Sequence, residues 1–231
     1  LAVGGDGAGS GPLLHAVART GAFERLWFQP AGAAAAALGA ALESGGDGPA
    51  GRALGPSYNA HEIRTFLRSR SVEPEDIGRD DVAAGVASLL DGKRRIGWFA
   101  GRLEFGEQAP ASRSVLSLPG RSPARDAVLA VPAERAGELL SVDDRVRSPL
   151  APAGTEPDAP VVFRADREEH RALHALLRAV EAAGRKPVLE CRPLAGPGEP
   201  LACTPRDAFE TAERGELDAL VMERYVVRPR P

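Results

Sequence analysis

The chain has 231 residues, a formal net charge of −3, 43% hydrophobic residues and 26% charged residues. These values are typical of a globular protein, and they exclude collagen-like, coiled-coil and highly charged disordered chains. The near-neutral charge argues against a dedicated nucleic-acid binder, and no apolar run reaches the roughly 18 residues that a membrane-spanning helix needs. Because two cysteines, Cys191 and Cys203, are too few for a disulfide scaffold, we expect a cytoplasmic protein.

The first fifty residues alternate between strand and helix patterns. A glycine-rich segment at residues 4–11 follows the first strand, and a glycine- and proline-rich boundary at residues 45–56 follows the last helix. Because the sequence begins at Leu1, already inside this pattern, we expect a fragment of a longer chain. The order predicts an α/β unit. The expected elements are a strand at 1–3, a helix at 13–20, a strand at 23–29 and an alanine-rich helix at 31–43.

The helices expected after the boundary begin with capping signals. Asn59 and Thr204 are expected N-caps, and Asp166 with Glu169 reads as a capping box before a long helix. Together with the strands between them, these helices again predict an α/β fold. The expected elements are helices at 60–70, at 80–90 with Asp80 as cap, at 166–184 and at 205–214, strands at 95–99, 115–118, 161–164, 187–191, 217–222 and 225–228, and irregular segments at 122–148 and 150–160.

Three features fit a chemical site, and each has a simpler structural interpretation. The glycine-rich segment 4–11 offers backbone N–H groups to a phosphate, but it matches neither a P-loop nor a dinucleotide fingerprint, so turn glycines explain it. His170 and His174 stand four residues apart, as metal ligands on a helix do, but without a third ligand they read as a surface pair. Cys191 and Cys203 have neither metal-site spacing nor a nearby histidine, so catalysis by either thiol is a minor alternative.

Residues 92–114 form the densest cluster of arginines and glycines in the chain. Arg102 and Arg113 stand next to expected turns at strand ends, where a planar guanidinium suits phosphate or carboxylate recognition. We expect Ser114 to add a hydroxyl to this site and Glu104 to orient the arginines. The alternative is a surface hairpin with solvated arginines.

The same cluster resembles the O-carbamoyltransferases of the NodU/CmcH type, which carbamoylate hydroxyl groups of antibiotics and nodulation factors. The resemblance extends in order along nearly the whole chain, including Leu54-Gly55-Pro56 and Gly198-Glu199-Pro200. It implies that residues 1–50 are part of an actin-like domain and that residues 51–231 are a YrdC-like domain. The residues of the cluster that match the family pattern are Gly97-Trp98-Phe99, Gly101-Arg102, Glu104-Phe105-Gly106, Ala109 and Arg113-Ser114.

The resemblance implies chemistry in two stages. The YrdC-like domain of the family joins carbamoyl phosphate and ATP into carbamoyl adenylate, and the metal-containing actin-like domain passes the carbamoyl group to a hydroxyl. Arg102, Glu104, Arg113 and Ser114 are the residues expected to bind ATP or carbamoyl phosphate.

Several polar positions of the family pattern are substituted in this chain. Ala33 stands where the family has a metal-ligand carboxylate, Glu107-Gln108 replaces a Pro-Arg pair, and residues 191–195 replace Asn-Thr-Ser-Phe-Asn. The chain is therefore expected not to bind the family's metal ion and not to act alone on a small-molecule substrate. Expected partners are an amino-terminal carbamoyltransferase half or an intact paralogue, and the alternative is a non-catalytic regulatory subunit.

Overall fold

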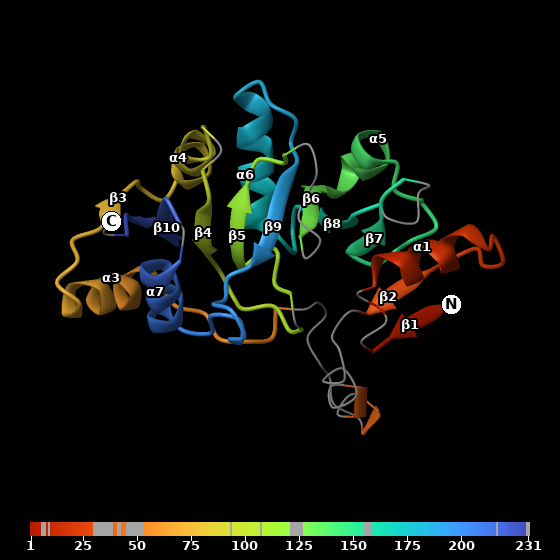
Figure 1. Ribbon diagram of the computed structural model, residues 1–231, viewed down its shortest axis with the longest axis horizontal. Helices are drawn as coiled ribbons and strands as arrows, with labels where there is room; N and C mark the ends of the chain where they lie inside the picture. Colours follow the sequence, from red (N-terminus) through yellow and green to blue (C-terminus); the bar gives the residue numbers. More distant parts are fainter. Residues whose placement is uncertain are drawn as a thin grey trace.

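The computed structural model describes residues 1–5, 8, 10–29, 39–40, 43–44, 53–92, 94–106, 108–120, 127–154, 159–215 and 217–229. In these residues, a nine-stranded mixed sheet has the order β3-β11-β10-β4-β5-β9-β6-β8-β7, and β1 and β2 form a separate parallel pair (Figure 1). This architecture confirms the predicted α/β class.

The strands are β1 (Ala2–Gly4), β2 (Trp27–Gln29), β3 (Glu75–Asp76), β4 (Ile96–Phe99), β5 (Arg113–Ser117), β6 (Val128–Pro132), β7 (Leu150–Pro152), β8 (Val161–Ala165), β9 (Leu189–Pro193), β10 (Ala219–Met222) and β11 (Tyr225–Val227). The helices are α1 (Gly11–Arg19), α3 (Ala60–Ser69), α4 (Val82–Leu89), α5 (Ala136–Leu140), α6 (Arg171–Ala182) and α7 (Pro205–Arg214), with a 3-10 turn, η2 (Ala133–Arg135), before α5.

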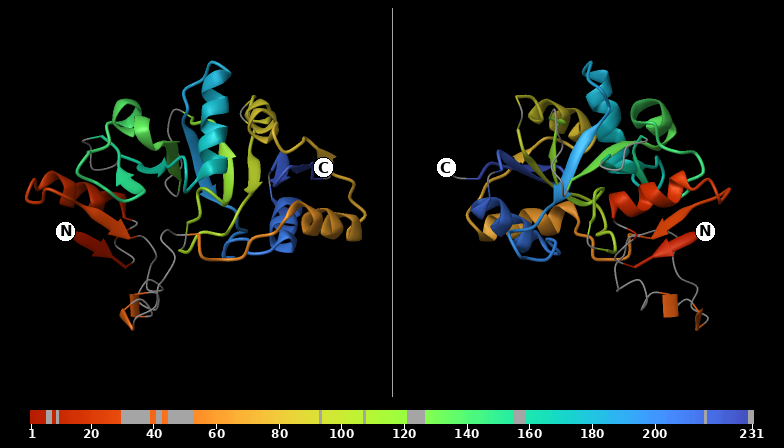
Figure 2. Two further views of the ribbon diagram at one scale, coloured as in Figure 1. Left: turned by 180° about the vertical axis from the view of Figure 1, so that it is seen from behind. Right: turned by 45° about the vertical axis from the view of Figure 1, so that its right-hand side comes forward.

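Alternating residues of the strands build separate cores on the two faces of the sheet. On one face, Ile96 and Trp98 of β4 pack with Leu116 of β5 beneath α4 and α6. These two helices lie on the same side of the sheet when the molecule is seen from behind (Figure 2). On the opposite face, Phe99 packs beneath α3 and α7, and Leu129 of β6 packs beneath α1 and α5. The centre of that face, at β5 and β9, lies between these two flanking cores.

The predicted caps of α3 and α7 are confirmed. The Oδ1 atom of Asn59 accepts from the backbone N–H of Glu62 at 3.0 Å, and the Glu62 carboxylate accepts from the N–H of Asn59 at 2.7 Å. Thr204 and Asp207 make the same reciprocal pair at α7, at 3.2 and 2.8 Å. The expected cap of α4 was wrong, because Asp81 rather than Asp80 precedes this helix, and its side chain makes no capping bond.

The capping box expected before α6 forms only in part. The Oδ1 atom of Asp166 accepts from the N–H groups of Glu168 and Glu169 at 2.7 and 3.0 Å, as a cap does. These N–H groups hold the pKa of the Asp166 carboxyl below its usual value. The N–H of Asp166, however, donates to Nδ1 of His170 at 3.0 Å instead of to the Glu169 carboxylate. His170 therefore belongs to the start of the helix.

Two segments expected to be irregular contain regular structure. Residues 122–148 include β6 and α5, and the supposed loop 150–160 begins with β7, which pairs antiparallel with β8. All five residues of β6 are buried, so its apolar run has no alternating pattern from which a strand is recognised. β7 is an edge strand, a position that tolerates Pro152.

The amino-terminal residues pack on the far end of the sheet. Leu14 of α1 and Phe28 of β2 are fully buried in the core that contains Leu129, and the N–H of Leu26 donates to the carbonyl of Arg145 at 2.9 Å. The predicted domain boundary near residue 50 stays a prediction, and most of the helix expected at 31–43 lies outside the described residues. Among those residues, no helix is both long and apolar enough to cross a membrane.

Candidate functional site

Arg113 is fully buried at the start of β5, beneath the loop that joins β4 to β5. Its Nη1 atom donates to the carbonyl oxygens of Ala100, Gly101 and Ser112 at 3.1, 3.3 and 2.8 Å, and its Nη2 atom donates to that of Gly101 at 3.3 Å. The guanidinium carbon lies 3.7 Å from the centre of the Phe99 ring. Burial lowers the pKa of this group to about 10, so Arg113 is still a cation at neutral pH. These contacts give Arg113 a structural role in the loop.

Glu104 and Ser114 also bond to the loop. The Glu104 carboxylate accepts from the N–H groups of Ala111 and Ser112 at 2.7 and 3.1 Å. The Ser114 hydroxyl donates to the carbonyls of Ala109 and Pro110 at 3.3 and 3.1 Å. Both side chains therefore fix the turn that precedes β5. Their expected role toward a ligand stays a prediction.

Arg102 is exposed on the same loop and contacts the segment that leads to α3. Its Nη1 atom donates to the carbonyl of Gly55 at 2.8 Å, and the N–H of Gly55 donates to Leu103 at 2.9 Å. A Cβ at Gly55 would lie 2.8 Å from Cβ of Leu103, so only glycine permits this close approach. The structure thus gathers Arg102, Glu104, Arg113 and Ser114 at the loop between β4 and β5 and at the start of β5, where each forms hydrogen bonds with other residues of the chain.

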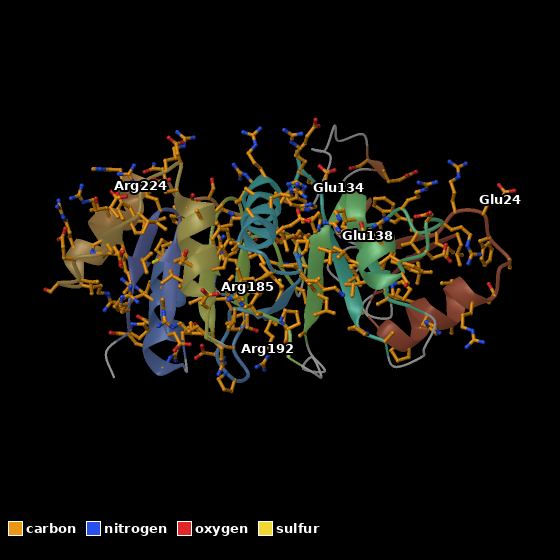
Figure 3. All side chains as sticks on the ribbon, turned by 90° about the horizontal axis from the view of Figure 1, so that it is seen from above. Glu24, Glu134, Glu138, Arg185, Arg192 and Arg224 are labelled. Atoms are coloured by element: carbon orange, nitrogen blue, oxygen red, sulfur yellow. The ribbon has the colours of Figure 1, made fainter. Side chains whose placement is uncertain are left out.

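A pocket of about 710 Å³ opens over β5 and β9, next to the carboxyl-terminal end of α7. Three arginines line it: Arg95 before β4, Arg192 on β9, which Figure 3 labels, and Arg214 at the end of α7. Val115 pairs with Arg192 across the strands, so these two side chains point to the same face. The pocket therefore lies on the central part of the sheet face, between the two flanking cores.

We call this cavity, which is lined by Arg95, Arg192 and Arg214, the arginine pocket. The site expected from the sequence did not include it. The arginines of the pocket lie far apart in the sequence, and the pairing of β4, β5 and β9 together with the packing of α7 on the sheet brings them together. One signal was present in the sequence: Arg192 lies within the segment 191–195, which replaces a polar motif of the carbamoyltransferase pattern.

His170, which precedes α6, and His174, within it, are both buried, so the surface pair expected from their spacing was wrong. His170 and His174 are 5% and 8% exposed. The His170 ring packs edge-on against Phe163 at 4.8 Å, and Nε2 of His174 lies 3.0 Å from Oε1 of Glu134 in the turn before α5. They are on the helix face that meets the sheet because Leu173 and Leu177 share that face.

Cys191 does not resemble a catalytic thiol. Cys191 is buried in the sheet, and burial raises the pKa of its thiol, which leaves it protonated and unreactive. Cys203 is exposed, and both thiols are free. In the part of the chain that the structure describes, no three side chains of His, Cys, Asp or Glu form a group able to hold a metal ion.

Comparison with known proteins gives three relatives and no matching family model. An uncharacterised protein of Synechocystis is 30% identical over 90% of this chain and 44% of its own length. Nodulation protein NolO of Bradyrhizobium diazoefficiens is 28% identical over 96% of this chain and 47% of its own length. Nodulation protein NolNO of Sinorhizobium fredii is 33% identical over 71% of this chain and 24% of its own length.

The relatives are much longer than this chain, which spans less than half of each. The first two alignments extend over 271 and 262 positions, more than the 231 residues of the chain, so these relatives carry insertions within the matched region. The nodulation proteins support a carbamoyltransferase-like relationship, as the pattern around Trp98 predicts. The chain is thus related to a class of long nodulation proteins, and it matches only part of them.

Proposed function

We propose that this chain is a carbamoyltransferase-related protein that binds ATP or carbamoyl phosphate in the arginine pocket and does not carbamoylate a hydroxyl acceptor by itself. The observation that carries the proposal is the convergence of Arg95, Arg192 and Arg214 on one pocket of about 710 Å³. Guanidinium groups bind phosphate oxygens through paired, charge-assisted hydrogen bonds. The volume is that of a typical small-molecule site.

The proposed ligands follow from the resemblance, because the related enzymes make carbamoyl adenylate from these two phosphates. In the pocket, the arginines would neutralise and orient phosphate groups, which is the main requirement of such a reaction. Val115 and Pro193 also line the pocket, and their apolar side chains offer a surface to the uncharged part of the ligand.

The proposal excludes independent carbamoyl transfer for two reasons. Both terminal nitrogens of Arg113 and the hydroxyl of Ser114 donate to backbone carbonyls. Ala33 replaces the ligand carboxylate of the family pattern, and the described residues offer no cluster of metal ligands. These residues do not fit the family's metal ion, and no step of the proposed function uses one.

A second candidate function is that of a non-catalytic partner of a carbamoyltransferase. It is favoured by the position of the large apolar side chains that are exposed among the described residues. Among the described residues, all the exposed large apolar side chains lie in the first 27 residues. The elements α1 and β2, which carry two of them, pack on the sheet through their other faces. Exposed apolar side chains that gather in one segment are what a contact with a partner would use. The residues are Leu1, Leu13, Phe23 and Trp27.

Calorimetric titration and a turnover assay test the proposal together. We expect saturable binding of ATP or carbamoyl phosphate at low ionic strength, weakened by added salt because the pocket is cationic. We expect no release of phosphate that depends on a nodulation-factor or antibiotic acceptor. The proposal would be abandoned if neither phosphate bound, or if acceptor-dependent turnover were seen with the chain alone.

A further inference from the structure

One arginine of the pocket is held by a carboxylate of the chain itself. Nη1 of Arg214 lies 2.7 Å from Oε1 of Glu199, and Nη2 lies 2.9 Å from Oε2, so the two groups form a bidentate pair. Both residues line the pocket, with side chains 58% and 39% exposed. Glu199 therefore occupies the two N–H groups of the Arg214 guanidinium that a phosphate or carboxylate ligand would bind.

The sequence around Glu199 builds a turn that returns this carboxylate to the pocket. The N–H of Glu199 donates to the carbonyl of Gly196 at 3.0 Å. Pro197 and Gly198 occupy the two central positions, and Gly198 has a φ of +71°. This is the geometry of a type II turn, which favours proline followed by glycine. The turn thus places Glu199 directly over Gly196.

Gly196 provides the space that the carboxylate occupies. A Cβ at this position would lie 2.6 Å from Oε2 of Glu199 and 2.9 Å from its Cδ atom, which is too close for either contact. The atoms that would have to move are at the end of a flexible side chain, so an alanine here displaces the carboxylate and leaves the backbone unchanged. Gly196 therefore permits the ion pair.

The guanidinium of Arg214 has a second anchor. Its Nε atom donates to the carbonyl of Glu210, one turn back on α7, at 3.1 Å. This bond keeps the fork pointed into the pocket when the carboxylate leaves. An exposed ion pair is weak and easily displaced.

We propose that Glu199 is an internal competitor for the anion site of the arginine pocket, and that a phosphate group binds by displacing it from Arg214. This inference rests on the proposed function, because it concerns the same pocket. It makes binding a substitution of one anion for another, so the side chain of Glu199 sets the affinity for phosphate-bearing ligands.

Titration of ATP at one low salt concentration tests this inference with four single variants. Glu199→Gln and Gly196→Ala are each expected to bind ATP about fivefold more tightly than the unmodified chain, the first by removing the carboxylate and the second by displacing it with no change of charge. Arg214→Gln is expected to bind more weakly. Glu210→Gln is the matched control: the Glu210 carboxylate pairs with Arg70 at 3.0 Å and does not line the pocket, so its replacement is expected to leave the affinity unchanged.

The outcomes separate the inference from the proposed function. If the unmodified chain binds ATP and both Glu199→Gln and Gly196→Ala bind it equally well, the competitor role is wrong while the pocket stands. If Glu210→Gln gains as much affinity as Glu199→Gln, the effect is one of net charge, and the inference is again overturned. If no form binds ATP, the inference is overturned, and if no form binds carbamoyl phosphate either, the proposed function of the pocket fails with it. Thermal unfolding of each variant verifies that it is folded.

Discussion

Replacing Arg113 with alanine is expected to lower the free energy of unfolding by about 2–4 kcal/mol. The guanidinium is fully buried and donates to the carbonyls of Ala100, Gly101 and Ser112. Alanine leaves these oxygens without their charged donor and opens a cavity beside the Phe99 ring. Urea unfolding monitored by circular dichroism measures the change, provided that the slope of the transition is the same in both proteins.

Arg113→Met is the matched control, because it keeps most of the side-chain volume and removes the hydrogen bonds. We expect it to recover part of the stability that alanine loses, and the remaining deficit then reports the bonds to the carbonyls. If Arg113→Ala unfolded like the unmodified chain but bound ATP more weakly, Arg113 would be a ligand residue, and the structural role assigned to it here would be wrong.

Replacing Trp98 with alanine is expected to lower the free energy of unfolding by about 3–5 kcal/mol. Trp98 is 1% exposed and belongs to the core beneath α4 and α6. Its Nε1 atom donates to the carbonyl of Ala111 at 2.9 Å, so the side chain also holds the loop that Glu104 caps. The same denaturation experiment measures this change.

The variant Trp98→Phe separates the contribution of core packing from that of the hydrogen bond to Ala111. Phenylalanine keeps most of the apolar volume and lacks the N–H, so we expect a loss of about 1–2 kcal/mol, with faster amide exchange at Ala111 and Ser112. An equal loss in both variants would mean that the hydrogen bond, and not the packing, dominates the role of Trp98.

The elements that the sequence predicts well have local signals. The caps at Asn59 and Thr204 depend on side chains within three residues of each other, and they are found as expected. The strand around Trp98 is short, apolar and bounded by glycines, and it too is present. Such signals need no knowledge of the rest of the chain.

The elements that were missed depend on distant parts of the chain. β6 is buried on both faces between β8 and β9, so its sequence lacks the alternation of a half-exposed strand. His174 lies on the buried face of α6, where its Nε2 atom forms a hydrogen bond with the carboxylate of Glu134, forty residues away in sequence. The spacing of two histidines carries no trace of that partner.

The candidate site also combines features that follow from neighbouring residues with features that depend on distant parts of the chain. Arg102, Glu104, Arg113 and Ser114 lie within thirteen positions of one another, and the structure places them at the β4–β5 connection and the start of β5; their expected role as a ligand site stays a prediction. The bonds of Arg113 to backbone carbonyls, however, depend on how that loop folds over β5. The arginine pocket depends on contacts between distant segments: the pairing of β4, β5 and β9 brings Arg95 and Arg192 to one face, and the packing of α7 adds Arg214.

The most direct test of the central claim is a titration of ATP and carbamoyl phosphate into the chain and two single variants. Arg192→Gln removes a cation of the pocket. Arg185→Gln removes the same charge after α6, where Arg185 pairs with Asp91, and Figure 3 labels both arginines. The account predicts that Arg192→Gln weakens binding about tenfold, as the loss of one charge-assisted contact does, while Arg185→Gln binds like the unmodified chain. Equal affinities for all three proteins would contradict the assignment of the phosphate site to this pocket.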